Sequence, residues 1–79
     1  MEKLIIGGMY QHYKGPLYKL LHLGRLEESL EEVIVYQALY NSEEFGNNAI
    51  WVRKKNVFLE EVDFNGKKVP RFKYIEEKL

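Results

Sequence analysis

The chain has 79 residues, of which 14% are aromatic, and its 12 Lys and Arg balance 12 Asp and Glu. This length predicts a single domain over residues 1–79, with a core close to the smallest that can offset chain entropy. The zero net charge excludes a general electrostatic attraction to nucleic acid or anionic membrane, and the absence of Cys excludes disulfides, thiolate nucleophiles and Cys-based zinc sites.

No apolar stretch approaches the ~20 residues needed to cross a bilayer. The short apolar run at the N-terminus, residues 1–8, lacks the long hydrophobic region and cleavage pattern of a signal peptide. We therefore expect a soluble, cytoplasmic protein with no membrane partner. From Met1 to Leu79 the chain is expected to be a whole small protein, the alternative being a domain of a longer chain.

The segment 8–16 concentrates side chains suited to recognition, with Tyr10, His12, Tyr13 and Lys14 followed by a Gly-Pro breaker. Strand alternation would place Tyr10, His12 and Lys14 on one face and Tyr13 on the other. In one interpretation tyrosine rings stack on a planar ligand while His12 and Lys14 meet an anion. In the alternative, the tyrosines complete a thin core and His12 hydrogen-bonds a backbone carbonyl.

Short segments rich in β-branched and aromatic residues, separated by loops that contain Gly and Asn, predict a meandering antiparallel sheet. The expected strands are 17–25, 33–40, 49–53 and 69–75. Residues 26–40 are ambiguous, because Ser29-Leu30-Glu31-Glu32 matches a helix capping box. We favour a strand there, since Val33-Ile34-Val35-Tyr36 is β-branched and aromatic, and the glutamates suit a solvated turn.

Asn65-Gly66 predicts a β-hairpin with a type I′ turn, because both central residues of that turn need positive φ. A two-residue loop then sets the register. The expected partners are Phe64 with Lys67, Asp63 with Lys68, Val62 with Val69, and Glu60 with Arg71. Pro70 has no N–H to donate, so its strand should lie at an edge or its ladder should break there.

The fold class expected from these elements is mainly β: a small SH3-like antiparallel barrel with a short helical turn at 54–58. Short, strongly twisted sheets without a covering helix close into barrels, since closure removes exposed edges. The alternative is an α+β domain, with a helix at about 29–40 packed on a small sheet.

Trp51 and Arg53 are two residues apart and share a strand face, whereas Ile50 and Val52 should occupy the opposite face in the core. Trp51, with Arg53 and the lysines at 54–55, would offer a stacking or cation–π platform with a basic rim. The alternative is that Trp51 caps the core.

The candidate ligand-binding residues share aromatic or basic chemistry and are Tyr10, His12, Lys14, Tyr36, Trp51, Arg53 and Arg71. They favour a non-enzymatic binding module that recognises nucleic acid or a peptide through a local patch. One alternative is a small enzyme or cofactor-binding protein with His12 as general base, and another is a homo-oligomeric structural protein.

No motif specifies catalysis, a cofactor or a metal. His12 and His22 are the only imidazoles, and without Cys they make a poor metal site. Ser29 is surrounded by glutamates that would hinder an oxyanion, which fits a cap or turn residue better than a nucleophile. The expectation therefore leans against an enzyme, with no catalytic residue, cofactor or metal.

The spacing of these pieces resembles a known bacterial family. The pattern runs Gly8-x-Tyr10-x-His12-Tyr13-Lys14-Gly15, Glu28-Ser29-Leu30-Glu31, Val33-x-Val35-Tyr36-Gln37-Ala38-Leu39-Tyr40, Trp51-Val52-Arg53, Phe58 and Pro70-Arg71-Phe72. It is similar to the domain-of-unknown-function 1653 (DUF1653) family over about residues 8–75. The resemblance implies a compact bacterial domain and transfers no activity.

The chain departs from that family's pattern at two positions. Leu26 stands where the family tends to have His, and Lys54 stands where it tends to have Pro. Chemistry that depends on the family's histidine would therefore be absent here. The segment 41–48 is expected to form a longer loop tip before Trp51.

Overall fold

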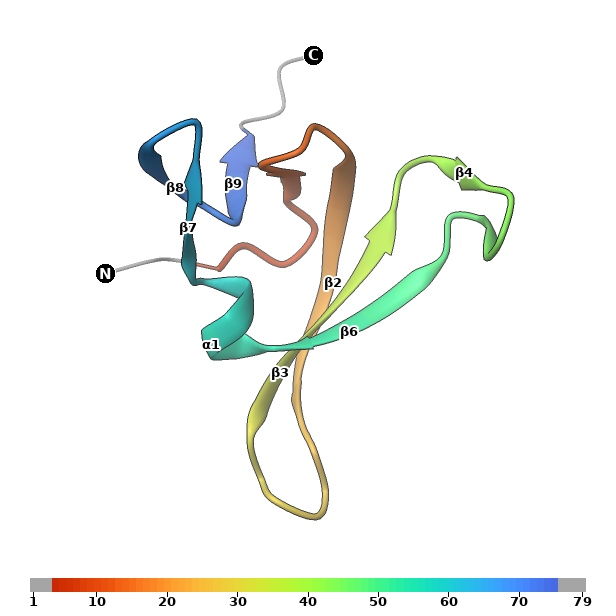
Figure 1. Ribbon diagram of the computed structural model, residues 1–79. Helices are drawn as coiled ribbons and strands as arrows, with labels where there is room; N and C mark the ends of the chain where they lie inside the picture. Colours follow the sequence, from red (N-terminus) through yellow and green to blue (C-terminus); the bar gives the residue numbers. More distant parts are fainter. Residues whose placement is uncertain (1–3, 76–79) are drawn as a thin grey trace.

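The computed structural model of the protein describes residues 4–75 (Figure 1). Met1 and Leu79, on which the expectation of a whole small protein depends, lie outside the described residues. The elements are β1 (Met9–His12), β2 (Leu17–Arg25), β3 (Glu32–Ala38), β4 (Asn41–Ser42), β5 (Gly46–Asn47), β6 (Ile50–Lys54), α1 (Lys55–Phe58), β7 (Glu61–Phe64), β8 (Lys67–Pro70) and β9 (Phe72–Ile75). At four residues, α1 is far too short to cross a bilayer, and the described chain has no helix that could.

The main sheet has five antiparallel strands in the order β6-β3-β2-β1-β9. This confirms the mainly β class, and the helix considered for residues 29–40 is wrong because β3 occupies most of that segment. Within the described residues, β6 and β9 remain the two edges and do not pair, so the sheet is open where a barrel would be closed. The chain passes from one edge to the other through α1 and the β7–β8 hairpin (Figure 1).

Strand β2 coincides with the predicted segment 17–25, whereas the predicted strand 69–75 is two strands. The break falls at Arg71, directly after Pro70, where β8 leaves its ladder with β7. From Phe72 onward the chain pairs with β1 instead. Arg71 still donates its N–H to the carbonyl of Glu60 at 2.9 Å, so the missing N–H of Pro70 leaves the β7 side of β8 paired and removes a donor from its outer side.

The β7–β8 hairpin has the predicted register. Phe64 pairs with Lys67, Asp63 with Lys68, and Val62 with Val69. The turn residues Asn65 and Gly66 have φ angles of 54° and 79°, as a type I′ turn requires. The contact between Glu60 and Arg71 is also present, with 2.8 Å between Oε1 and Nη2.

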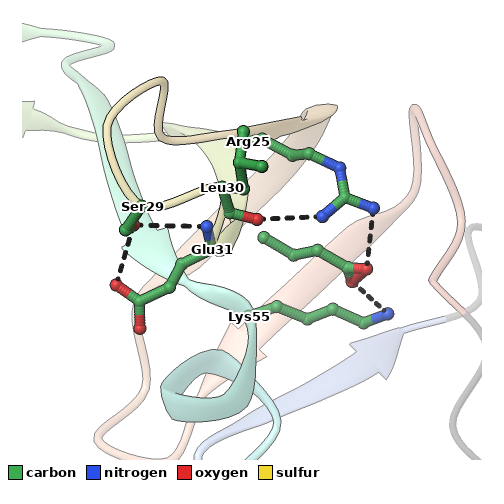
Figure 2. Close-up of polar contacts among 6 residues, drawn as sticks. Arg25, Ser29, Leu30, Glu31 and Lys55 are labelled. Atoms are coloured by element: carbon green, nitrogen blue, oxygen red, sulfur yellow. Dashed lines mark hydrogen bonds and ion pairs between the residues drawn. The ribbon is translucent and has the colours of Figure 1, made fainter.

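The acidic turn between β2 and β3 is held by hydrogen bonds and ion pairs (Figure 2). Ser29 Oγ accepts the N–H of Glu31 at 3.2 Å, so Ser29 acts as a turn residue. Arg25 Nη1 donates to the carbonyl of Leu30 at 2.9 Å. The carboxylate of Glu32 lies 2.9 Å from Lys55 Nζ and 3.6 Å from Arg25 Nη2. These contacts tie the tip of the hairpin to α1.

The core lies on one face of the main sheet. Its buried cluster consists of Tyr10, Leu20, Ile34, Tyr36, Phe58 and Phe72. The short helix α1 supplies Phe58, whose ring stacks on Phe72 with centroids 4.1 Å apart and planes 5° apart. Aromatic rings therefore make up most of this core, and edge-to-face contacts join them to one another.

The prediction that Ile50 and Val52 belong to the core is wrong. They are 53% and 57% exposed, because β6 turns Trp51 and Arg53 toward the core side. In the β3–β6 ladder, Trp51 pairs with Tyr36, so the two side chains lie on the same face of the sheet. Strand alternation separates the two sets but does not say which set faces inward.

Candidate functional site

Arg53 is the centre of the candidate site. Its Nε donates to the hydroxyl of Tyr36 at 3.1 Å, and its guanidinium carbon lies 5.6 Å from the ring centroid of Phe72. The side chain is half-buried, and it makes no ion pair within residues 4–75. A guanidinium held over an aromatic ring, with its Nη groups not bonded to a described carboxylate, is suited to bind an anion.

His12 contacts the same aromatic ring. It pairs with Phe72 in the β1–β9 ladder, and the two rings meet edge to face with centroids 5.1 Å apart. Nδ1 of His12 accepts the backbone N–H of Lys14 at 3.2 Å, so the neutral imidazole carries its proton on Nε2.

The electrostatic surroundings of His12 are positive. Burial lowers the pKa of His12 below 6.5, and the charges of Arg53, Arg71 and Lys14 lower it further. All the charges named here are cations, so the same field that disfavours an imidazolium favours a bound anion. His12 is therefore a neutral hydrogen-bond donor near neutral pH.

A tyrosine pair completes the site, and its central member was missed by the sequence analysis. Tyr18 lies 5.6 Å from Phe72 between ring centroids, and its hydroxyl is 2.7 Å from that of Tyr40. Burial raises the pKa of Tyr18 above 10.0, and the hydrogen bond to Tyr40 raises it further. We call Arg53, His12, Tyr18, Tyr40 and Phe72 the Arg53 cluster. Only the cross-strand register places Tyr18 there, which is why no local motif indicated it.

Tyr10 and Tyr36 are core residues, each 4% exposed. The hydroxyl of Tyr10 accepts the backbone N–H of Ile5 at 2.9 Å, and that of Tyr36 accepts from Arg53. Their rings are covered, so neither presents the stacking surface considered for it. For Tyr10 the thin-core interpretation describes the structure, whereas Tyr36, a ligand-binding candidate, is a core residue that positions Arg53.

Trp51 is half-buried against the core, and it meets Phe45 edge to face at 4.9 Å. The basic rim expected beside it is neutralised, because Lys54 lies 3.3 Å from Glu31 and Lys55 lies 2.9 Å from Glu32. Trp51 thus caps one side of the core, and Arg53 supplies the cation–π contact through Phe72.

The other two basic candidates differ in how firmly they are held. Arg71 is tied down: its Nη2 lies 2.8 Å from Glu60, and its Nε donates to the carbonyl of Val57 at 3.1 Å. Lys14 is exposed, and within residues 4–75 it forms no ion pair. The structure therefore brings His12 and Arg53 together at Phe72 and leaves Lys14 next to them. Arg71 instead holds Glu60 and the carbonyl of Val57.

His12 also lines an open pocket of about 400 Å³. A carboxylate beside His12 would support the general-base alternative, but none of the described residues that line this pocket is acidic. No group of three His, Asp or Glu side chains that could hold a metal occurs in the part of the chain that the structure describes. The geometry therefore supports binding of an anion more directly than proton abstraction.

Comparison with known proteins agrees with the sequence pattern. Residues 8–74 match the family model described as protein of unknown function (DUF1653). A crystal structure of a DUF1653 protein from Bordetella bronchiseptica superposes with a TM-score of 0.80 at 33% sequence identity, covering 95% of this chain and 92% of that one. No curated protein matches the chain. The chain therefore belongs to the DUF1653 family of proteins of unknown function.

Proposed function

We propose that this domain is a non-enzymatic binding module that holds single-stranded nucleic acid through the Arg53 cluster. The observation that carries the proposal is the placement of Arg53. Phe72 and Tyr36 fix its guanidinium, while no described carboxylate neutralises it. Such a guanidinium can donate two parallel hydrogen bonds to one phosphate.

The aromatic rings beside Arg53 supply the second half of the recognition. Tyr40 is exposed, Tyr18 is half-buried, and their rings meet edge to face at 5.6 Å. Bases of single strands stack on such rings, and each stacked base is worth ~1–3 kcal/mol. A phosphate on Arg53 and a base on Tyr40 would use both properties of the cluster.

The charges of the cluster limit how strongly phosphates can bind. Arg53 in the cluster and Lys14 beside it have no ion pair in residues 4–75, whereas the neighbouring Arg71 is paired with Glu60. Two phosphate contacts predict a slope of about −1.4 for log K against log salt on a single strand. We therefore expect weak binding that is detectable at low salt.

Fluorescence anisotropy of labelled oligo-U and oligo-dT, titrated over a range of salt concentrations, tests the proposal. Arg53→Gln should weaken binding by about tenfold, because hydrogen bonds to charged groups contribute ~1.5–3 kcal/mol. The slope of log K against log salt should also become shallower by about 0.7 for this variant. Arg25→Gln is the matched control: Arg25 is tied to Leu30 and Glu32 at the far hairpin tip, so binding should not change.

Binding that is absent at low salt, or that Arg53→Gln leaves unchanged, would sink the nucleic-acid proposal. An acidic peptide of the same charge is the comparison ligand in each titration. If the peptide binds more tightly than the oligonucleotides and depends on Arg53, then the cluster is a peptide site instead. Light scattering of each sample shows whether a homo-oligomer forms with or without ligand.

A further inference from the structure

The open pocket beside His12 is a second site, which shares only His12 with the Arg53 cluster. It lies between residues of β1 and its following turn on one side and the β7–β8 hairpin on the other, and Arg53 does not line it. Its volume of about 400 Å³ falls in the range of small-molecule sites, ~300–1,000 Å³.

Four side chains give the pocket an apolar wall: Tyr13, Phe64, Val69 and Pro70. The rings of Tyr13 and Phe64 meet edge to face with centroids 5.5 Å apart, which joins the β1–β2 turn to the hairpin. Phe64 is exposed although its ring is large and apolar. An apolar ligand that covers this surface would remove it from water, which favours binding.

The polar lining of the pocket has one sign of charge. Lys73 is exposed and makes no ion pair in residues 4–75, and its β1 partner Gln11 lies beside it in the ladder. The amide of Gln11 already donates to the carbonyl of Gly15 at 3.1 Å. His12 adds a neutral imidazole with a proton on Nε2. Among residues 4–75, no Asp or Glu lines the pocket.

We propose that this pocket binds a small, free carboxylic acid with an apolar or aromatic body. The body packs between Tyr13, Phe64 and Val69, and the carboxylate meets Lys73. One lysine balances one carboxylate charge, whereas a phosphate dianion would need further donors. This inference does not depend on nucleic-acid binding, because the two sites share only His12.

Two-dimensional amide NMR spectra of the full chain, titrated with 3-phenylpropanoate, test the inference. The expected result is a set of saturable shifts at Gly15, Val69 and Lys73. The uncharged 3-phenylpropanamide should bind about fivefold more weakly, the effect of ~1 kcal/mol for an exposed ion pair. Inorganic phosphate should give no saturable shifts in this pocket.

Variants separate the charge from the apolar wall. Lys73→Gln should weaken binding of the acid about fivefold and leave the affinity for the amide unchanged. Lys19→Gln is the matched control, since Lys19 is exposed on β2 and does not line the pocket. Phe64→Ala should weaken both ligands. Arg53→Gln should leave acid binding within about twofold, which keeps this test separate from the nucleic-acid test.

Equal affinities for acid and amide would overturn the inference, as would a Lys73→Gln variant that binds the acid normally. Shifts that spread over β2 and β3 without saturating at the pocket would also refute it. A short peptide with a C-terminal Phe is the final ligand. If it binds more than about tenfold tighter than the free acid, the pocket is a site for peptide C-termini and the free-acid assignment is wrong.

Discussion

Replacing Phe58 with Leu should be among the most damaging conservative changes in this protein. Phe58 is 1% exposed and contacts three aromatic rings: Phe72 at 4.1 Å, Tyr36 at 5.5 Å and Tyr10 at 5.6 Å between centroids. Each aromatic pair contributes ~0.5–1.5 kcal/mol beyond the area it buries. Leu keeps most of the apolar burial but loses all three pairs, so we expect a loss of about 2–3 kcal/mol.

That loss is large for a domain of this size. A chain of 79 residues has a free energy of unfolding of about 4–12 kcal/mol. Urea unfolding followed by Trp51 fluorescence gives the free energy directly. With a slope of ~1 kcal/mol per molar urea, the midpoint of Phe58→Leu should fall by about 2–3 M.

The control is the same substitution at an exposed ring. Phe64 is 42% exposed and has one aromatic partner, Tyr13. Phe64→Leu should therefore cost no more than about 1 kcal/mol. If Phe58→Leu costs no more than Phe64→Leu, the aromatic contacts of α1 do not contribute this stability to the core.

Three further predictions concern titration and backbone conformation. The pKa of His12 is held below 6.5 in the folded state, so the contribution of His12 to stability is complete above that pH and is lost as pH falls toward the folded pKa. In the His12→Asn variant, the urea midpoint should therefore decline less steeply as the pH is lowered. The pKa of Tyr18 lies above 10.0, and Tyr40→Phe should lower it without restoring the ordinary value, because burial remains; tyrosinate absorbance during alkaline titration measures this. Gly66→Ala should lower the free energy of unfolding in urea by about 1 kcal/mol, because φ at Gly66 is +79°. Gly24 has an ordinary φ, and an added Cβ would meet only Val33 at 3.7 Å, so Gly24→Ala should be neutral or stabilising.

Local chemistry predicted the parts of the fold that depend on neighbouring residues. The Asn65-Gly66 turn fixed the register of its hairpin, because positive φ at two adjacent residues allows few alternatives. The β-branched residues of β3 form a strand despite the capping-box match, and Ser29 Oγ accepts the N–H of Glu31 within a tight turn. In both cases the deciding interactions lie within a few residues along the chain.

Long-range relations were harder to predict. The apolar character of Ile50 and Val52 predicts the wrong inward face for β6, because Arg53 on the opposite face contacts the core residues Tyr36 and Phe72. Tyr18 was missed because its place beside Phe72 depends on two strand ladders. His12 and Arg53 likewise meet only through the ring of Phe72 on β9, and no sequence spacing indicates this.

The attachment of the β7–β8 hairpin has a consequence for motion. In the part of the chain that the structure describes, these two strands form no ladder with the main sheet. Arg71 joins them to it, because its N–H donates to Glu60 at the start of the hairpin and its carbonyl accepts from Tyr13 after β1. A two-stranded ribbon is only marginally stable by itself. The hairpin is therefore a unit that can open at a lower free energy than the five-stranded sheet. Because Phe64 and Val69 form one wall of the pocket, such an opening would widen the pocket and leave the Arg53 cluster intact.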